Sequence, residues 1–452
     1  MGTGWKVPLA GFVGAVLAVL TGPVATGHAA PEVAAPEVAA LEVTGTSRVS
    51  VASVGTEANQ DSFSLTPRIS ADGQFVAFVS NATNLVPEDT NGTWDVFVRD
   101  RQAGTTSRVS VASDGTQANG ASPDTPAISW GGRFVAFESD ASNLVPGDTN
   151  GASDVFVRDL RTGTTTLASV AYDGGPANGG SLFGVAISGD GRFVAFESFA
   201  SNLVPGDTNG VRDVFVRDRW SGTTSRVSVS GDGAQANETS ESVAISADGR
   251  FVAFDSLASN LVPADTNGTW DVFVRDRRAD TTSRVSVATD GTQANAESVA
   301  KAVSADGRYV VFDSFASNLV PGDTNGVWDV FVRDRWAGAT SRVSVSGTGA
   351  QGNGRSFDAT VSPDGRYVSF SSVASNLVPD DTNGVQDVFL RDRWAGTTTR
   401  VSLADDGAQA NSFSASGSVG ADGKSIAFAS FASNLVPDDT NGAWDVFVRD
   451  RT

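Results

Sequence analysis

The pattern Asp-Thr-Asn-Gly-x-x-Asp-Val-Phe-Val/Leu-Arg-Asp occurs seven times in this chain of 452 residues. Its copies begin at Asp89, Asp148, Asp207, Asp265, Asp323, Asp381 and Asp439, so the spacing is 58 or 59 residues. A repeat of this length, in a chain rich in Val, Ser, Thr and Gly, is typical of propellers and repeat arrays. Each unit of such a protein buries its faces only against its neighbours, which lets the chain exceed the usual size of one core.

Each copy contains four short stretches that favour β-strands. In the fifth copy they are Ala302–Ser304, Tyr309–Asp313, Trp328–Arg333 and Thr340–Val345. An Asp-Gly turn separates the first two stretches, which is a strong hairpin signal. No stretch has the pattern of a long amphipathic helix. Four antiparallel strands per repeat predict an all-β propeller blade.

The repeats are offset from the ends of the chain. A fourth-strand sequence, Thr46–Val51, precedes every complete copy, and the chain ends just after a third-strand sequence, Asp445–Arg449. If the first strand completes the last blade, the ring closes and no open edge is left to aggregate. The sequence therefore predicts a closed seven-bladed β-propeller over residues 45–452, four antiparallel strands per blade, with the last blade completed by the N-terminal strand.

The turn between the first two strands carries a family resemblance. Ser362-Pro363-Asp364-Gly365-Arg366 leads into Tyr367–Phe370, and variants recur in the other copies, although the second has Trp130-Gly131-Gly132 at the turn. This stretch resembles the WD40-like (PD40) repeat of TolB-type propellers. The resemblance covers all seven copies and implies the propeller fold.

The N-terminus predicts export. Lys6 precedes the apolar run Leu9–Leu20, and small residues follow through Ala30. The run is shorter than the roughly 20 residues of a membrane helix and has the layout of a cleaved signal peptide. We therefore expect a signal peptide at residues 1–30 and a linker at 31–44. The mature chain is expected to be secreted or in the cell envelope, without a membrane span.

Charge and composition exclude several functions. The formal net charge is −20, which argues against nucleic acid because phosphates require a clustered basic surface. No cysteine is present, so disulfides and thiol nucleophiles are excluded. The only histidine, His28, lies in the predicted signal peptide. The mature chain then lacks Ser-His-Asp and Cys-His catalysis as well as imidazole metal sites.

Antiparallel strands place alternate connections on opposite faces of the ring. We expect one face to carry the short turns, with Arg308, Arg333, Arg335 and Arg342 of the fifth copy. The other face is expected to carry both long connections of each repeat, which are rich in Asp, Asn and Gly. Binding residues are usually found on loops held by a rigid scaffold, so the Asp/Asn-rich face is the predicted binding face.

The Asp-Thr-Asn-Gly motif has two interpretations. Oxygen side chains at its positions one, three and seven suit calcium, which binds six to eight oxygens. Alternatively, the motif is a type I′ Asn-Gly turn whose Asp side chains bond nearby backbone amides. The candidate metal ligands, one set per blade, are Asp89, Asn91, Asp95, Asp148, Asn150, Asp154, Asp207, Asn209, Asp213, Asp265, Asn267, Asp271, Asp323, Asn325, Asp329, Asp381, Asn383, Asp387, Asp439, Asn441 and Asp445. Calcium is the only cofactor that the sequence indicates.

The acidic residues recur almost identically in every copy, whereas catalysis needs one site unlike the others. The sequence therefore predicts a non-enzymatic binding or scaffold module, monomeric, that uses the Asp/Asn-rich face for a protein or glycan. Two alternatives remain open. One is a calcium-stabilised surface module, and the other is a carbohydrate-active enzyme that uses paired carboxylates.

Overall fold

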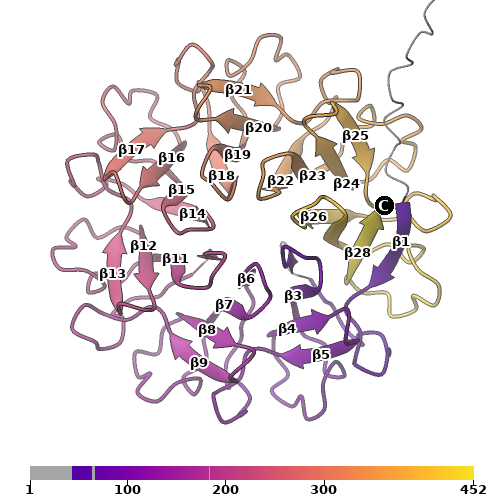
Figure 1. The fold of residues 1–452 in the computed structure, drawn as a ribbon, viewed down its shortest axis with the longest axis horizontal. Helices are drawn as coiled ribbons and strands as arrows, with labels where there is room; N and C mark the ends of the chain where they lie inside the picture. Colours follow the sequence, from indigo (N-terminus) through magenta and orange to yellow (C-terminus); the bar gives the residue numbers. More distant parts are fainter. Residues whose placement is uncertain (1–42, 64–66, 183, 452) are drawn as a thin grey trace, which may run out of the picture. The chain divides into compact units, whose positions relative to one another are not determined.

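A computed structural model describes residues 43–63, 67–182 and 184–451. These residues form seven four-stranded antiparallel sheets and contain no helix, so the predicted seven-bladed β-propeller is confirmed (Figure 1). The predicted signal peptide, 1–30, and most of the predicted linker, 31–44, lie outside the described residues. No helix that could cross a membrane occurs in the described ranges.

Blades 1 to 7 follow the chain, and each contributes one strand to each of four concentric positions (Figure 1). The inner strands are β2 (Arg68–Ile69), β6 (Ala127–Ile128), β10 (Val185–Ile187), β14 (Ser240–Ile245), β18 (Ser298–Val303), β22 (Ser356–Val361) and β26 (Ser414–Val419). The second strands are β3 (Phe75–Ser80), β7 (Phe134–Ser139), β11 (Phe193–Ser198), β15 (Phe251–Ser256), β19 (Tyr309–Ser314), β23 (Tyr367–Ser372) and β27 (Ser425–Ser430). The third strands are β4 (Asp95–Asp100), β8 (Asp154–Asp159), β12 (Asp213–Asp218), β16 (Asp271–Asp276), β20 (Asp329–Asp334), β24 (Asp387–Asp392) and β28 (Asp445–Arg451). The outer strands are β5 (Thr105–Arg108), β9 (Thr164–Leu167), β13 (Thr223–Arg226), β17 (Thr281–Arg284), β21 (Ala339–Arg342), β25 (Thr397–Arg400) and β1 (Val43–Arg48).

The N-terminal strand closes the ring as predicted. β1 pairs antiparallel with β28, with Thr46 opposite Arg449 and Arg48 opposite Phe447. The strand begins and ends three residues earlier than expected. Its ladder is continued by the amide of Val49, which donates to the carbonyl of Val446 at 2.7 Å. Blade 7 is therefore built from both ends of the described chain.

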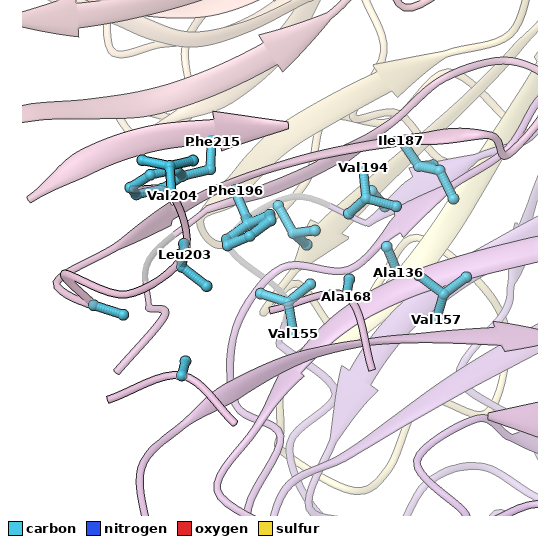
Figure 2. Close-up of a cluster of buried hydrophobic side chains, with 14 residues drawn as sticks. Ala136, Val155, Val157, Ala168, Ile187, Val194, Phe196, Leu203, Val204 and Phe215 are labelled. Carbon is cyan, nitrogen blue, oxygen red and sulfur yellow. The ribbon is translucent and has the colours of Figure 1, made fainter. Parts of the chain in front are cut away.

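The core lies between adjacent blades. In every blade a phenylalanine of the second strand packs on one of the third strand, as Phe78 does on Phe97 with ring centroids 5.8 Å apart. Figure 2 shows the cluster between blades 2 and 3, where Phe196 and Val194 of β11 face Val155 and Val157 of β8. Each fully buried Phe contributes about 1.5–3 kcal/mol of transfer free energy. Phe97 and its counterparts in the other blades are fully buried and form this core.

Glycine in the hairpin turn between inner and second strands is needed for packing between blades. Gly132, at φ +70°, lies against the ring of Phe75 in blade 1, and a Cβ at Gly132 would come within 2.1 Å of that ring. The turn of blade 2 departs from the Asp-Gly pattern through Trp130 and Gly131, yet it keeps this glycine. The position therefore needs glycine both for its left-handed backbone and for the close contact.

Candidate functional site

The Asp-Thr-Asn-Gly motif forms a polar clamp. In blade 1 the guanidinium of Arg108, at the end of β5, lies 3.0 Å from a carboxylate oxygen of Asp89 and 3.2 Å from one of Asp95. Asn91 donates to Asp95 at 2.9 Å and to the carbonyl of Ala118 at 3.2 Å. The motif thus ties the third strand to the outer strand and to the connection that leads into the next blade.

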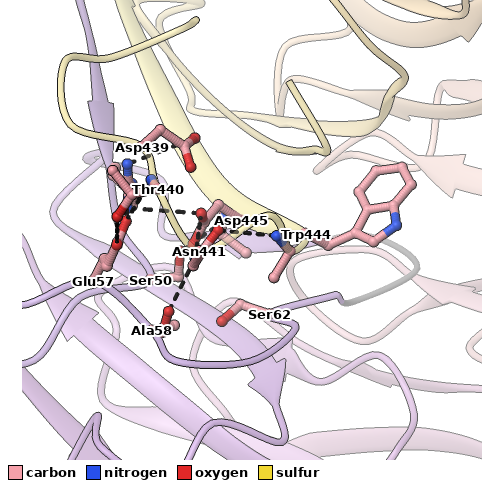
Figure 3. A network of polar contacts seen from close by, with 12 residues as sticks. Ser50, Glu57, Ala58, Ser62, Asp439, Thr440, Asn441, Trp444 and Asp445 are labelled. Carbon is pink, nitrogen blue, oxygen red and sulfur yellow. Dashed lines mark hydrogen bonds and ion pairs between the residues drawn. The ribbon is translucent and has the colours of Figure 1, made fainter. Parts of the chain in front are cut away.

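The same clamp recurs around the ring. Blade 7 takes its arginine, Arg48, from the N-terminal strand, 3.6 Å from Asp439 and 3.8 Å from Asp445. Figure 3 shows this copy, in which Asn441 bonds Asp445 and the carbonyl of Ala58. The arginines of the other clamps are Arg226, Arg284, Arg342 and Arg400. Closure of the ring therefore completes the last clamp.

Blade 2 lacks the arginine. Leu167 occupies its position in β9, so Asp148 and Asp154 have no guanidinium between them. Asp154 still accepts from Asn150 at 2.7 Å and from Ser169. Burial raises the pKa of Asp154, and the neighbouring charge of Asp148 raises it further. One clamp of the seven is therefore incomplete.

These contacts bear on both interpretations of the motif. The type I′ turn is wrong, because only the glycine, such as Gly92 at φ +63°, has a positive φ and the preceding asparagine does not. The Asp side chains bond arginine, serine and asparagine side chains, and Asp148 of blade 2 also accepts from the backbone amide of Asn150. Among the described residues no group of three or more Asp, Glu or His could hold a metal ion. Calcium binding stays a prediction, and blade 2, without its guanidinium, is the copy on which to test it.

Exchanging the residue between the two carboxylates tests the clamp. Arg108→Leu gives blade 1 the composition of blade 2 and leaves the buried Asp95 facing Asp89. We expect it to lower the free energy of unfolding by about 2–4 kcal/mol, since breaking a buried ion pair leaves an uncompensated charge. Leu167→Arg is the matched control, which we expect to raise the melting temperature. Equal melting temperatures for wild type and Arg108→Leu, by circular dichroism, would contradict the clamp.

One residue of the predicted arginine face lies elsewhere. Arg342 pairs with Asp323 and Asp329, at the end of the blade where the long connections lie. It was assigned to the short-turn face because it follows the turn closely in sequence, but β21 ends at Arg342 and carries the side chain away from that turn. Arg308 does lie on the short-turn face, where it pairs with Asp334 at 2.7 Å.

The blades differ from one another at the ring axis. The fifth residue of the second strand is Val79 in blade 1, Ser371 in blade 6 and Ala429 in blade 7. In the four consecutive blades between them it is a buried acid: Glu138, Glu197, Asp255 and Asp313. This position lies where the second strand ends and the inner strand begins, toward the face with the long connections. The sequence-based assumption that acidic residues repeat equally in all blades fails here.

Each buried acid holds the inner strand of the following blade. Glu138 accepts from the amide of Gly184 at 2.9 Å, and Glu197 accepts from the amide of Ser242 at 2.7 Å. Asp255 and Asp313 accept in the same way from the amides of Ala300 and Asp358, at 3.1 and 2.8 Å. The acids thus position the backbone that surrounds the axis.

Ser242 and Asp358 adopt a strained backbone. Both are non-glycine residues with φ of +55°, and both lie where the register of the inner strand shifts. Left-handed residues and bulges cost free energy and are concentrated at binding and active sites. The amides of these two residues donate to Glu197 and Asp313, so the buried acids stabilise the strained backbone.

A hollow of about 340 Å³ opens beside the axis, lined by Glu197, Arg212, Glu241 and Ser242. Arg212 lies 3.1 Å from Glu197 and also pairs with Glu241. It occupies the position that is tryptophan in four other blades. Burial raises the pKa of Glu197 to about 7, although the charge of Arg212 opposes this shift. The hollow therefore contains a carboxyl group able to gain or lose a proton near neutral pH.

A second cavity of about 200 Å³ lies on the axis and is lined by residues of six blades. Its charged residues are Arg68, Lys301 and Asp358. Lys301 lies 3.1 Å from Asp358 and 3.4 Å from Asp313. Burial raises the pKa of Asp313 to about 7, against the attraction of Lys301. We call this space the axial cavity, the neighbouring hollow the side hollow, and the two together, which share Ser242, the axial site.

The raised pKa values predict how stability depends on pH. Burial raises the pKa of Glu197 and Asp313 to about 7 and that of Asp445 to about 6. The folded chain then holds protons that the unfolded chain releases above about pH 4, so stability falls as pH rises from about 4 to 7. The opposite trend begins below about pH 4, because Arg133 and Arg250 lower the pKa of Asp159 and Asp276 to about 2.

We therefore expect a higher melting temperature at about pH 5.5 than at about pH 8. The difference should persist in high salt, which screens the net charge of −20 but not buried groups. Glu197→Gln should reduce it. A melting temperature that rises from pH 5.5 to pH 8 would contradict these shifts.

The fold is shared with solved structures. No protein-family model matches the chain, and no curated protein matches its sequence. An oligogalacturonate lyase in complex with manganese is 12% identical, with a TM-score of 0.53 over 91% of this chain and 96% of the lyase. The β-propeller domain of the Trilobed protease from Pyrococcus furiosus is 11% identical, with a TM-score of 0.52 over 86% of this chain and 96% of that domain. TolB from Acinetobacter baumannii is 15% identical, with a TM-score of 0.38 over 66% and 59% of the two chains.

These findings confirm one prediction and overturn another. The propeller fold that the resemblance implied is confirmed. The prediction of a non-enzymatic binding or scaffold module is wrong. Its premise, that no site differs from the others, fails at the axial site, and the similar structures include an enzyme and a domain of a protease.

The residues that the sequence interpretation missed carried a visible signal. Arg212 replaces tryptophan, and Glu138, Glu197, Asp255 and Asp313 interrupt an otherwise uniform position of the second strand. The differences between copies, rather than the pattern they share, point to the axial site.

Proposed function

We propose that this protein is a carbohydrate-active enzyme that cleaves a glycosidic bond at the axial site. The observation that carries the proposal is the broken sevenfold symmetry. The blades differ where two hollows meet, and there they bring together Glu197, Arg212 and Glu241. The carbohydrate class is supported by the propeller of an oligogalacturonate lyase, whose fold this chain shares.

Glu197 is the proton-transfer group in this proposal. Its pKa of about 7 allows it to accept a proton from the substrate, or donate one to the leaving oxygen, at neutral pH. Arg212 orients both Glu197 and Glu241, and it can stabilise negative charge that develops on the substrate. The export signal predicted at residues 1–30 would place this activity outside the cytoplasm.

The experiment is a panel of polysaccharides incubated with the mature protein, with and without added metal ions. Release of reducing ends would indicate hydrolysis, and new absorbance from unsaturated ends would indicate elimination. We expect one of the two signals with at least one acidic polysaccharide, such as polygalacturonate. No product from any member of the panel would overturn the proposal.

A further inference from the structure

The axial cavity contains an arginine with no side-chain partner among the described residues. Arg68, in the inner strand of blade 1, makes no side-chain hydrogen bond or ion pair with any residue that the structure describes. Lys301, the other cation in the lining of the cavity, is already paired with Asp358 and Asp313. Arg68 is therefore the one described cation of the cavity with its donors free for a ligand.

The surroundings of this guanidinium affect its charge. Burial lowers the pKa of Arg68 to about 10, and the carboxylate of Asp358 only partly offsets that effect. An arginine carries five donors in a planar fork that fits carboxylate and sulfate oxygens. Arg68 is partly exposed and lines a cavity of about 200 Å³, so an anion in the cavity can reach these donors.

The balance of charge around the cavity allows an anion to bind. Asp358 is neutralised by Lys301, and Asp313 has a pKa raised to about 7. Burial also raises the pKa of Asp255 and Glu138, which lie behind the inner strands. The raised pKa values therefore reduce the negative charge around the cavity. The hydroxyl groups of Thr125, Ser242 and Thr360 provide neutral contacts in the lining.

We infer that the axial cavity is an oxyanion subsite, in which Arg68 binds the carboxylate or sulfate group of one sugar residue. This inference rests on the proposed function and narrows it to acidic saccharides. The cavity and the side hollow share Ser242 and are therefore adjacent, so in this inference the saccharide extends from Arg68 toward Glu197.

Ligand-observed NMR titration with three probes tests the subsite. Galacturonate carries a carboxylate, galactose 6-sulfate carries a sulfate, and galactose carries neither. We expect one or both anionic probes to bind the wild-type protein at least about tenfold more tightly than galactose, as is typical for a charge-assisted bond. The stronger of the two identifies the source of the anionic group.

Arg68→Gln should abolish this preference, and Arg68→Lys should restore part of it. Arg161→Gln is the matched control, because Arg161 is exposed on the short-turn face and its loss changes the net charge equally. Equal binding of all three probes, the absence of binding by both anionic probes, or an unchanged preference in Arg68→Gln would overturn the subsite. Thermal melts of the variants show whether the fold is intact.

The two proposals fail separately. If the anionic probes bind through Arg68 but no polysaccharide is cleaved, the catalytic proposal fails and the subsite stands. If a polysaccharide is cleaved and Arg68→Gln leaves kcat and KM unchanged, the subsite fails and the catalytic proposal stands.

Discussion

A chain that begins at Ala52 should melt about 10 °C or more below a chain that begins at Val43. The shorter chain lacks β1, the outer strand of blade 7, and so exposes the edge of β28. It also loses Val49, which is buried, and Arg48, which completes the clamp of Asp439 and Asp445. Several ladder bonds at about 1 kcal/mol each and a broken ion pair of about 3 kcal/mol approach the total stability of an ordinary domain.

A peptide of residues 43–51 supplied in trans provides the control. If closure of the ring is the cause, the peptide should bind the shorter chain and restore most of its melting temperature, because binding to the folded state alone stabilises it. The shorter chain should also aggregate more readily, since β28 then presents an open strand edge. Identical melting curves for the two chains would show that the ring does not depend on β1.

Glu197→Gln should reduce kcat by about 100-fold or more on any polysaccharide that the wild-type protein cleaves. Glutamine keeps the shape of the side chain and can still accept from the amide of Ser242, but it cannot transfer a proton. The loss should appear mainly in kcat, with KM changed less. The pH–rate profile of the wild-type protein should change near pH 7, where Glu197 titrates, and this change should be absent from the variant.

Glu138→Gln is the matched control for this variant. Glu138, in blade 2, holds the amide of Gly184 in the following blade as Glu197 holds that of Ser242, but Glu138 does not line the side hollow. A merely structural role of the buried acids predicts similar losses in both variants. Retention of full kcat in Glu197→Gln would remove Glu197 from the proposed chemistry.

The architecture could be predicted because it depends on what the copies share. The repeat period predicted the blades, and the fourth-strand sequence ahead of the first copy predicted that the ring closes. The pairing of β1 with β28 confirms this closure. The bounds of the strands were less accurate. The inner strand of blade 5 begins at Ser298, four residues before the predicted Ala302, and its register shifts between Ala300 and Ala302. Small residues and a bulge in this strand obscure the alternation of apolar and polar residues by which strands are predicted.

The site could not be predicted in the same way, because it depends on contacts between residues distant in sequence. Arg108 lies between Asp89 and Asp95 only once two strands and a long connection have folded together. The six blades that line the axial cavity supply residues from Arg68 to Thr360. The pattern shared by the copies does not show such positions, and the proposed function depends on how the copies differ.

The most direct measurement is a crystal structure of the Glu197→Gln variant soaked with an acidic oligosaccharide, beginning with trigalacturonate. We expect the saccharide to occupy the axial site, with an anionic group at Arg68 and a glycosidic oxygen beside residue 197. A saccharide bound instead to the Asp-Thr-Asn-Gly loops or to the short-turn face, with the axial site empty, would contradict this expectation.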